Sequence, residues 1–247
     1  MASPQIIVLI TGGNNGIGFE TAKNLVYSSE KYHILLGSRD VAKGEAAVAQ
    51  LQSGPIKGTV SSIQIDVTSD KSVDAAAEEV IQAYGRLDVL VNNAGIFSQN
   101  PVLRDAFREV YAVNLFGVVS TTEAFLPALR KSSEPRLVFV SSSTGSISIL
   151  ADPTSRHHIG AGKPYRSSKA ALNFLMVSYW IDLQKENFKV FGADPGLNAT
   201  NLMNTEELRQ RGAPEPYVGG ERVASVIRGD RDEDVGKVCG EPGTVPW

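Results

Sequence analysis

Short apolar runs recur along most of the chain, with amphipathic stretches between them. The runs occupy residues 5–10, 33–37, 62–66, 87–91, 136–141 and 188–193. Because each run is apolar on both faces, it is typical of a strand in a parallel sheet that helices cover on both sides. The alternation predicts an α/β fold: one Rossmann-like, doubly wound domain over residues 1–247.

The stretch after Ser69 shows the helical period most clearly. One stripe carries Val73, Ala76, Ala77, Val80, Ile81 and Tyr84. Gly85 is placed to end this helix. Two longer helices are expected around 104–130 and 164–187.

The C-terminal part has a weaker apolar pattern, beginning at about residue 203. Gly and Pro are dense at 212–220 and again at 240–246. We interpret residues 197–220 as a loop on the substrate side and the end of the chain as a short tail.

The composition argues against several classes of function. The net charge is -3, from 24 basic and 27 acidic side chains without a basic block, which argues against nucleic acid as a partner. One cysteine, Cys239, and three histidines offer no disulfide and no metal-ligand spacing, so we expect a reducing compartment and no metal. The run at 5–10 is too short for a membrane span or a signal sequence, so we expect a cytoplasmic protein with no membrane partner.

A glycine-rich turn follows the first apolar run directly and reads Thr11-Gly12-Gly13-Asn14-Asn15-Gly16-Ile17-Gly18. Glycines let backbone N–H groups approach a pyrophosphate at a helix N-terminus. The residues predicted to hold a dinucleotide here are Gly12, Asn14, Asn15, Gly16, Ile17 and Gly18. A tight turn without any ligand uses glycines in the same way, and that alternative stays open for this motif alone.

The end of the second run decides which dinucleotide is expected. Ser38 stands where an NAD site usually has an acidic residue, and Arg39 offers a guanidinium for a 2′-phosphate, so we predict NADP(H). The alternative for Arg39 is a solvated charge at a helix start, beside Asp40. Asp66, with Val67 after it, is placed to accept from the adenine amino group; its alternative role is a helix cap.

The fourth run is followed by Asn92-Asn93-Ala94-Gly95. Small side chains let the backbone pass close to a cofactor, so Asn93, Ala94 and Gly95 are predicted to line the cofactor site. An ordinary turn explains this motif nearly as well in isolation.

The motifs TGGNNGIG, NNAG, YRSSK and Asp194-Pro195-Gly196 occur together in the order typical of one family. Over roughly residues 5–200 the chain resembles the short-chain dehydrogenases/reductases, and it looks most like their NADPH-dependent carbonyl reductases. Many of those carry a basic residue where this chain has Asn15, so the NADP preference depends on Arg39. The resemblance implies hydride transfer between the cofactor and a small-molecule ketone or aldehyde, or a secondary alcohol in reverse. It also implies a homodimer or homotetramer formed through the two long helices.

Tyr165 and Lys169 are four residues apart in a predicted helix, so their side chains share one face. The resemblance implies that Tyr165 is the proton donor, its pKa lowered by the Lys169 ammonium and the nicotinamide cation. Lys169 is also expected to bind the nicotinamide ribose, and Asn114 to hold a water in a proton relay. The alternative for Asn114 is a buried, hydrogen-bonded helix residue.

Three serines, Ser141 to Ser143, end the fifth run. The resemblance makes Ser142 the hydroxyl that polarises the substrate, with Ser143 as the alternative. The gap from Ser142 to Tyr165 is 23 residues, longer than is common in the family, so an insertion at 151–164 is expected to border the active site. In it, His157 and His158 either contact substrate or are solvated.

The substrate and nicotinamide end is expected after the sixth run. By resemblance, the backbone of Pro195 and Gly196 meets the carboxamide of the cofactor, and Thr200 hydrogen-bonds the carboxamide or a phosphate; an ordinary turn is the alternative. An apolar substrate pocket is suggested by Phe97, Leu150, Leu202, Met203 and Tyr217, each of which also suits core packing.

Two other functions remain open at this point. A non-catalytic NADP(H)-binding redox sensor would need the glycine turn and Arg39 but not Ser142, Tyr165 and Lys169 together. A specialised biosynthetic enzyme could couple reduction to cyclisation or dehydration. The sequence does not identify the substrate.

Overall fold

The structure is a computed structural model that describes residues 5–241 and 243–247. Its strands are β1 (Ile6–Ile10), β2 (Tyr32–Ser38), β3 (Thr59–Gln64), β4 (Val89–Asn92), β5 (Arg136–Val140), β6 (Lys189–Ala193), β7 (Val238–Gly240) and β8 (Gly243–Val245). Its helices are α1 (Gly16–Ser28), α2 (Val41–Gln52), α3 (Asp70–Tyr84), α4 (Leu103–Tyr111), α5 (Gly117–Leu129), α6 (Ile147–Ala151), α7 (Lys163–Leu183), α8 (Thr205–Gln210) and α9 (Pro216–Arg228). The short helical turns are η1 (Ala112–Phe116), η2 (Ser143–Gly145), η3 (Gln184–Glu186) and η4 (Asp232–Asp234).

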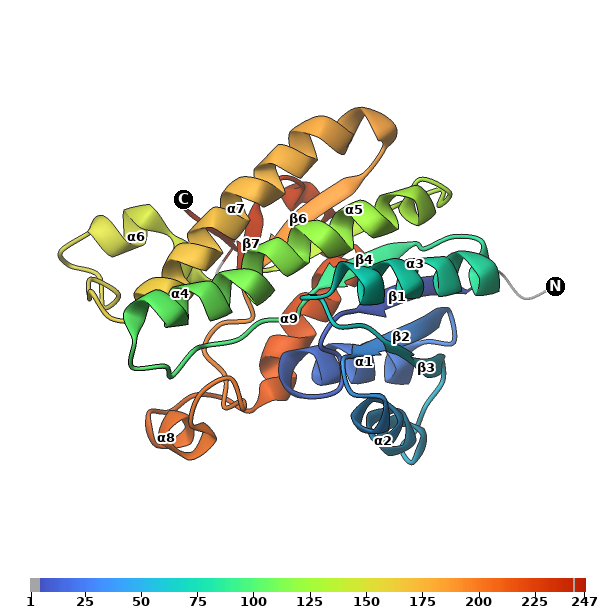
Figure 1. Cartoon of the computed structure of the whole chain (residues 1–247), viewed down its shortest axis with the longest axis horizontal. Coiled ribbons are helices and arrows are strands. Elements are labelled where there is room, and N and C mark those ends of the chain that lie inside the picture. The colour runs from blue at the N-terminus through green and yellow to red at the C-terminus, as the bar shows by residue number, and fades with distance from the viewer. Residues whose placement is uncertain (1–4, 242) are drawn as a thin grey trace.

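The strands form one sheet in the order β3-β2-β1-β4-β5-β6-β7-β8 (Figure 1). All neighbouring strands are parallel except β7 and β8, which pair antiparallel. The chain runs outward from β1 through β2 to β3 and then crosses to β4 on the other side of β1. Ligands of open α/β sheets bind at such a switch point. The predicted doubly wound sheet is therefore confirmed.

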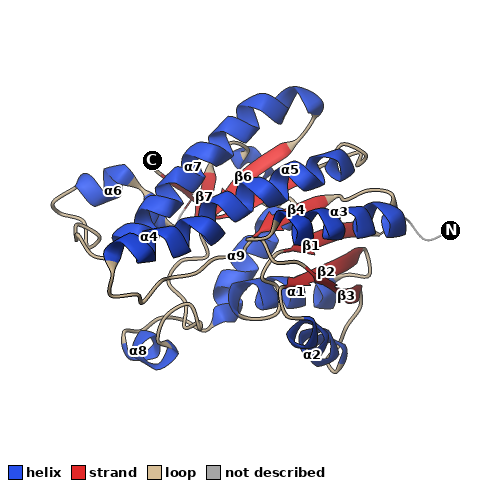
Figure 2. Ribbon diagram, in the orientation of Figure 1, coloured by secondary structure: helices blue, strands red, loops and turns tan. Residues whose placement is uncertain are grey.

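Successive residues of the central strand serve two different cores. Ile7 and Leu9 pack in the layer of α3, α5 and α7, whereas Val8 and Ile10 pack in the layer of α1, α2 and α9. Figure 2 shows the strands lying between these helical layers. Burial on both faces is what the continuous apolar runs predict.

One predicted strand is displaced. The run at 62–66 belongs to β3, which begins earlier, at Thr59, and ends at Gln64. β3 is an edge strand of the sheet, and only Val60 and Ile63 in it are buried, so its polar first half carried no apolar signal.

The helix predicted after Ser69 is confirmed as α3. The Ser69 hydroxyl accepts from the Ser72 N–H at the start, and Gly85 adopts the left-handed conformation at the end, with φ of 74°. Val73 and Val80 are fully buried on its inner stripe.

The first long helix runs from Leu103 to Leu129 as α4, η1 and α5. It is long and apolar enough to cross a membrane by length and composition, but half of its most apolar window is buried inside the domain. Core helices of soluble proteins pass the same test, so this is weak evidence for a membrane span.

The C-terminal part of the chain differs from the prediction. The expected loop at 197–220 contains α8, and its last residues belong to α9, which begins at Pro216. The expected tail pairs with the sheet as β7 and β8. Gly219 and Gly220 are helical residues at a close helix contact: a Cβ on Gly220 would lie 2.6 Å from Glu20 Cβ in α1. These glycines allow two helices to pack closely, and composition alone does not distinguish such glycines from those of a loop.

Candidate active site

The glycine turn lies at the C-terminal end of β1, at the switch point of the sheet. Gly12 and Gly16 have φ of 62° and 55°, which favours glycine at both positions. A Cβ on Gly18 would come within 2.5 Å of the Asn93 amide nitrogen. The turn is therefore both left-handed and tightly packed, and α1 starts from it.

The Asn92-Asn93-Ala94-Gly95 segment is tied to this turn. The Asn93 amide donates to the carbonyl oxygens of Thr11 and Gly12 at 2.8 and 3.1 Å. The Thr11 hydroxyl accepts from the N–H groups of Asn93 and Ala94, both at 3.0 Å. These bonds join the ends of β1 and β4, which supports a role beyond an ordinary turn.

A cleft of about 560 Å³ runs along this edge of the sheet. Among its lining residues are Gly12, Asn14, Asn15, Gly16, Ile17, Ser38, Arg39, Asp66, Val67, Asn93, Ala94, Gly95, Tyr165, Lys169, Pro195 and Thr200. The glycine turn lines it at the helix N-terminus, and cationic side chains line it beyond β2. This lining fits a phosphorylated dinucleotide.

Two cationic side chains line the cleft just beyond the end of β2. Ser38 is buried, and its hydroxyl donates to the Asp40 carbonyl at 2.8 Å. Arg39 is exposed, and none of the described carboxylates lies within ion-pair distance of its guanidinium. Lys43, in the first turn of α2, lines the same part of the cleft; sequence reasoning missed it, although it lies four residues after Arg39.

Asp66 lines the cleft but does not cap a helix. Its Oδ1 accepts from the Thr68 N–H at 3.0 Å and from the Thr68 hydroxyl at 2.7 Å, and these bonds hold the pKa of the carboxyl below its usual range. Ser69 is the residue that caps α3. The helix-cap alternative for Asp66 is therefore wrong.

Tyr165 and Lys169 lie on the face of α7 that lines the cleft. The Lys169 Nζ is 5.6 Å from the centre of the Tyr165 ring and donates to the Val140 carbonyl at 2.7 Å. The Ser142 hydroxyl lies near enough to the Tyr165 phenol to lower its pKa, and it pairs with the Thr144 hydroxyl at 2.9 Å. Of the two candidate serines, Ser142 is thus the one that meets Tyr165.

Asn114 lies in η1, a turn of π-helix between α4 and α5, and is fully buried. Its Oδ1 accepts from the Ile96 N–H at 2.9 Å, and its amide donates to the Ser168 hydroxyl at 3.1 Å. A Cβ on Gly95 would lie 3.5 Å from this Oδ1 and 3.8 Å from the Lys169 Nζ, so the two side chains converge there. π-Helical turns often occur at functional sites.

Burial controls the protonation of the pair. It lowers the pKa of Lys169 to about 8 and raises the pKa of the Tyr165 phenol. The nearby Asp194 carboxylate raises the pKa of both groups, and the Ser142 hydroxyl opposes the rise at Tyr165. The protein alone therefore does not lower the pKa of Tyr165 as expected, because burial and Asp194 raise it by more than Ser142 lowers it.

The Pro195-Gly196 turn is held by residues that sequence reasoning did not assign. Asp194 is buried and accepts from the N–H groups of Gly196 and Ser143, at 2.8 and 2.9 Å. Asn198 and Arg222 each donate to the Pro195 carbonyl, at 2.8 and 2.9 Å. The signal available in the sequence for Asp194 was an acidic residue directly before a Pro-Gly pair. Arg222 comes from α9, a helix that the sequence analysis did not predict.

Two of the expected substrate-pocket residues reach the site. The Phe97 ring packs on the Tyr165 ring with centres 5.7 Å apart, and Leu202 lines the cleft. Leu150, Met203 and Tyr217 are not among the cleft residues.

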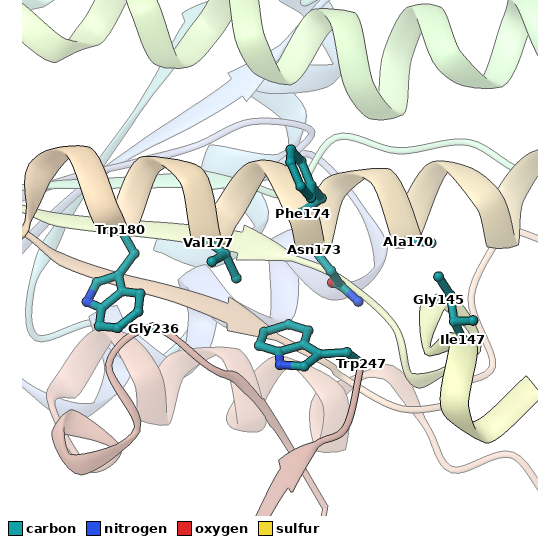
Figure 3. A pocket seen from close by; sticks show the side chains of 9 residues that line it. All are labelled: Gly145, Ile147, Ala170, Asn173, Phe174, Val177, Trp180, Gly236 and Trp247. Carbon is teal, nitrogen blue, oxygen red and sulfur yellow. The ribbon is translucent and has the colours of Figure 1, made fainter.

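A second cavity, of about 420 Å³, lies on the other side of α7. Figure 3 shows Val177 and Trp180 extending from α7 toward Trp247, whereas Phe174 points to the opposite side of the helix. The lining carries no ionisable side chain, and its one amide, Asn173, hydrogen-bonds the Ser141 hydroxyl. None of the residues that line this cavity is among the predicted catalytic residues.

The fold and the Ser-Tyr-Lys site place the chain in the short-chain dehydrogenase/reductase family, whose model, described as short chain dehydrogenase, matches residues 6–211. The chain is 39% identical over 262 residues to the short-chain dehydrogenase/reductase tropE of Talaromyces stipitatus, covering 98% of each. It is 32% identical to salutaridine reductase of Papaver bracteatum, over 75% of this chain and 70% of that protein. The solved structure of NADPH-bound carbonyl reductase from chicken fatty liver superimposes with a TM-score of 0.78, covering 99% of this chain and 100% of the other at 25% identity. The chain is therefore an oxidoreductase that acts on carbonyls and uses a nicotinamide dinucleotide.

Proposed function

We propose that this protein is an NADPH-dependent reductase of ketone or aldehyde carbonyls. The observation that carries the proposal is the convergence of Ser142, Tyr165 and Lys169 beside a cleft that begins at the glycine turn and passes Arg39. A protein that only binds the dinucleotide has no need of this hydroxyl, phenol and ammonium together.

Each group has a defined task in this proposal. Held in the cleft, NADPH would supply the hydride, and the oxidised nicotinamide would supply a positive charge that favours the phenolate. Ser142 and Tyr165 donate hydrogen bonds to the carbonyl oxygen, which stabilises the charge that develops there. Tyr165 then donates its proton, and Lys169 with Asn114 serves to resupply it.

The preference for NADPH rests on the two cations at the end of β2. Arg39 and Lys43 both line the cleft beside Ser38, which stands where an NAD site usually has an acidic residue. A guanidinium binds phosphate oxygens by charge-assisted hydrogen bonds, and an ammonium adds a point charge. Asp40 is the nearest acid: its carboxylate lies 3.9 Å from the Lys43 ammonium and accepts from the Lys43 N–H.

Turnover by the purified protein tests the proposal. Oxidation of NADPH is followed against a panel of ketones, aldehydes and quinones, with NADH in parallel. Tyr165→Phe is expected to abolish turnover while NADPH affinity stays near that of the wild type. Tyr179→Phe is the matched control, because this phenol lies on the same helix but hydrogen-bonds Glu123.

Two outcomes would contradict the proposal. Retained turnover in Tyr165→Phe would remove the assigned proton donor. Tight NADPH binding by the wild type without turnover on any panel member would favour a redox sensor or a specialised biosynthetic enzyme.

A further inference from the structure

The segment between α6 and α7, residues 152–162 and here called the insert loop, has few contacts of its own. Most of its residues are exposed. Its internal bonds are local turns, such as the Thr154 N–H to the Asp152 carboxylate at 2.8 Å and the His158 N–H to the Ser155 carbonyl at 2.9 Å. In Figure 1 it projects at one end of the domain, away from the sheet. A loop of this kind needs an external anchor to keep one conformation.

The His158 ring pairs with the Leu150 carbonyl in α6 at 2.9 Å, and Arg166 supplies a second, larger anchor. Its Nη2 donates to the His157 carbonyl at 2.8 Å and its Nη1 to the Ile159 carbonyl at 2.5 Å, so the guanidinium holds two points of the insert loop. Its Nε donates to the Thr144 carbonyl at 3.2 Å, in the turn after Ser142. The planar guanidinium directs rigid donors to several carbonyls at once, which a lysine ammonium on a flexible stem cannot reproduce.

The same residue is one position away from the proposed proton donor. Thr144, which it holds, contacts the Ser142 hydroxyl through both its own hydroxyl and its N–H. At the other end of the insert loop, a Cβ on Gly162 would lie 3.6 Å from the Phe97 ring, and Phe97 packs on Tyr165. The insert loop therefore abuts the aromatic side of the site while its middle is fixed to the serine turn.

We propose that Arg166 is a positioning residue that fixes the insert loop as the substrate-side wall of the active site and thereby sets which carbonyl substrates fit. The proposal rests on the function proposed above, because a wall at this place acts on whatever molecule lies between Ser142 and Tyr165. The Arg166 guanidinium hydrogen-bonds none of the three residues assigned to proton transfer, Tyr165, Lys169 and Asn114. Loss of the Arg166 side chain should therefore affect KM, which depends on substrate binding, more than kcat, which depends on proton transfer.

Three variants test this role: Arg166→Ala, Arg166→Lys and the control Arg156→Ala. Arg156 lies in the insert loop itself and is exposed, and among the described residues its side chain hydrogen-bonds only the neighbouring His157 ring, at 3.2 Å. In Arg166→Ala we expect the KM for the best substrate to rise about tenfold or more, with kcat and NADPH affinity within about threefold of the wild type. Arg166→Lys should restore little of this loss, and Arg156→Ala should behave as the wild type.

Hydrogen exchange of the NADPH-saturated protein gives a readout that needs no turnover. Amides of residues 152–162 should exchange faster in Arg166→Ala, whereas α7 keeps its protection, which also shows that the variant is folded. Unchanged exchange in the insert loop, or faster exchange with unchanged KM, would overturn the proposal. A wild-type protein without turnover would refute the proposed function instead, and the exchange experiment would still decide whether Arg166 holds the loop.

Discussion

Replacing Gly220 with Ala tests the unexpected contact between α9 and α1. The added methyl would lie 2.6 Å from Glu20 Cβ, 2.7 Å from the Glu20 carbonyl carbon and 2.8 Å from the Thr21 nitrogen. Ordinary carbon contacts are about 3.5–4.0 Å, so α9 must move by about 1 Å. None of the three atoms can rotate away, because two belong to the backbone and the third is a β carbon.

The size of the effect follows from two opposed contributions. Overpacking by one methyl costs about 1–3 kcal/mol of unfolding free energy. Alanine regains about 1 kcal/mol of helix propensity over glycine. Because the clash involves immobile atoms, we place its cost at the upper end, which leaves a net loss of about 2 kcal/mol. For a chain of this length that lowers Tm by roughly 4–8 °C.

Thermal unfolding measured by circular dichroism checks this value, and Gly44→Ala is the matched control. Gly44 is also helical, but its nearest atoms, the Cβ atoms of Ser38 and Ser62, lie at 3.2 Å. The smaller overpacking cost should cancel the gain in helix propensity, so Gly44→Ala should be about as stable as the wild type. A Gly220→Ala protein as stable as the wild type, or more stable, would refute the argument.

The same variant has a functional consequence. α9 carries Gly219, whose N–H donates to Asn198, and Arg222, which donates to the Pro195 carbonyl. Displacing the helix should therefore loosen the Pro195-Gly196 turn. NADPH affinity, measured by fluorescence titration, should fall in Gly220→Ala and remain unchanged in Gly44→Ala.

Three further predictions concern the cleft. Arg39→Ala should weaken NADPH by about tenfold or more in titrations at low salt but leave NADH nearly unchanged, and Lys43→Ala should do the same to a smaller extent; equal losses for both cofactors would remove the 2′-phosphate assignment. Lys169, with a pKa of about 8, binds fewer protons in the folded than in the unfolded protein above that pH. Between pH 7 and pH 9 the free energy of unfolding of the cofactor-free protein should therefore rise by about 1 kcal/mol more than that of Lys169→Met. Denaturant titrations that show no such difference would contradict the lowered pKa of Lys169. Asp194→Asn should shift the pH profile of alcohol oxidation to lower pH, because the carboxylate raises the pKa of Tyr165; an unmoved profile would exclude this charge effect.

The sequence was informative where a motif is local. The glycine turn, the Asn93 segment and the Tyr165-Lys169 pair each lie at the end of a predicted strand or on one predicted helix, so parallel topology alone brings them to the same edge. The structure places all of them along the cleft.

The parts that failed depend on distant contacts. Gly219 and Gly220 resemble loop residues until α1 is seen against them. β7 has three residues and is recognisable only beside β6. Lys43 reaches the cleft because α2 starts directly after β2, and Arg222 reaches Pro195 because α9 packs there. None of these relations has a signal within a short window of sequence.

The charge pattern around Tyr165 bears on the direction of the proposed reaction. Reduction requires the phenol to hold its proton before hydride transfer, whereas oxidation requires it to be ionised. Burial and the Asp194 carboxylate both favour the protonated phenol, and Asp194 cannot easily move because it is bonded to the N–H groups of Ser143 and Gly196. At physiological pH the protein groups therefore hold Tyr165 ready to donate. Loss of the Lys169 proton above a pKa of about 8 would limit the resupply, so reduction should decline on the alkaline side first.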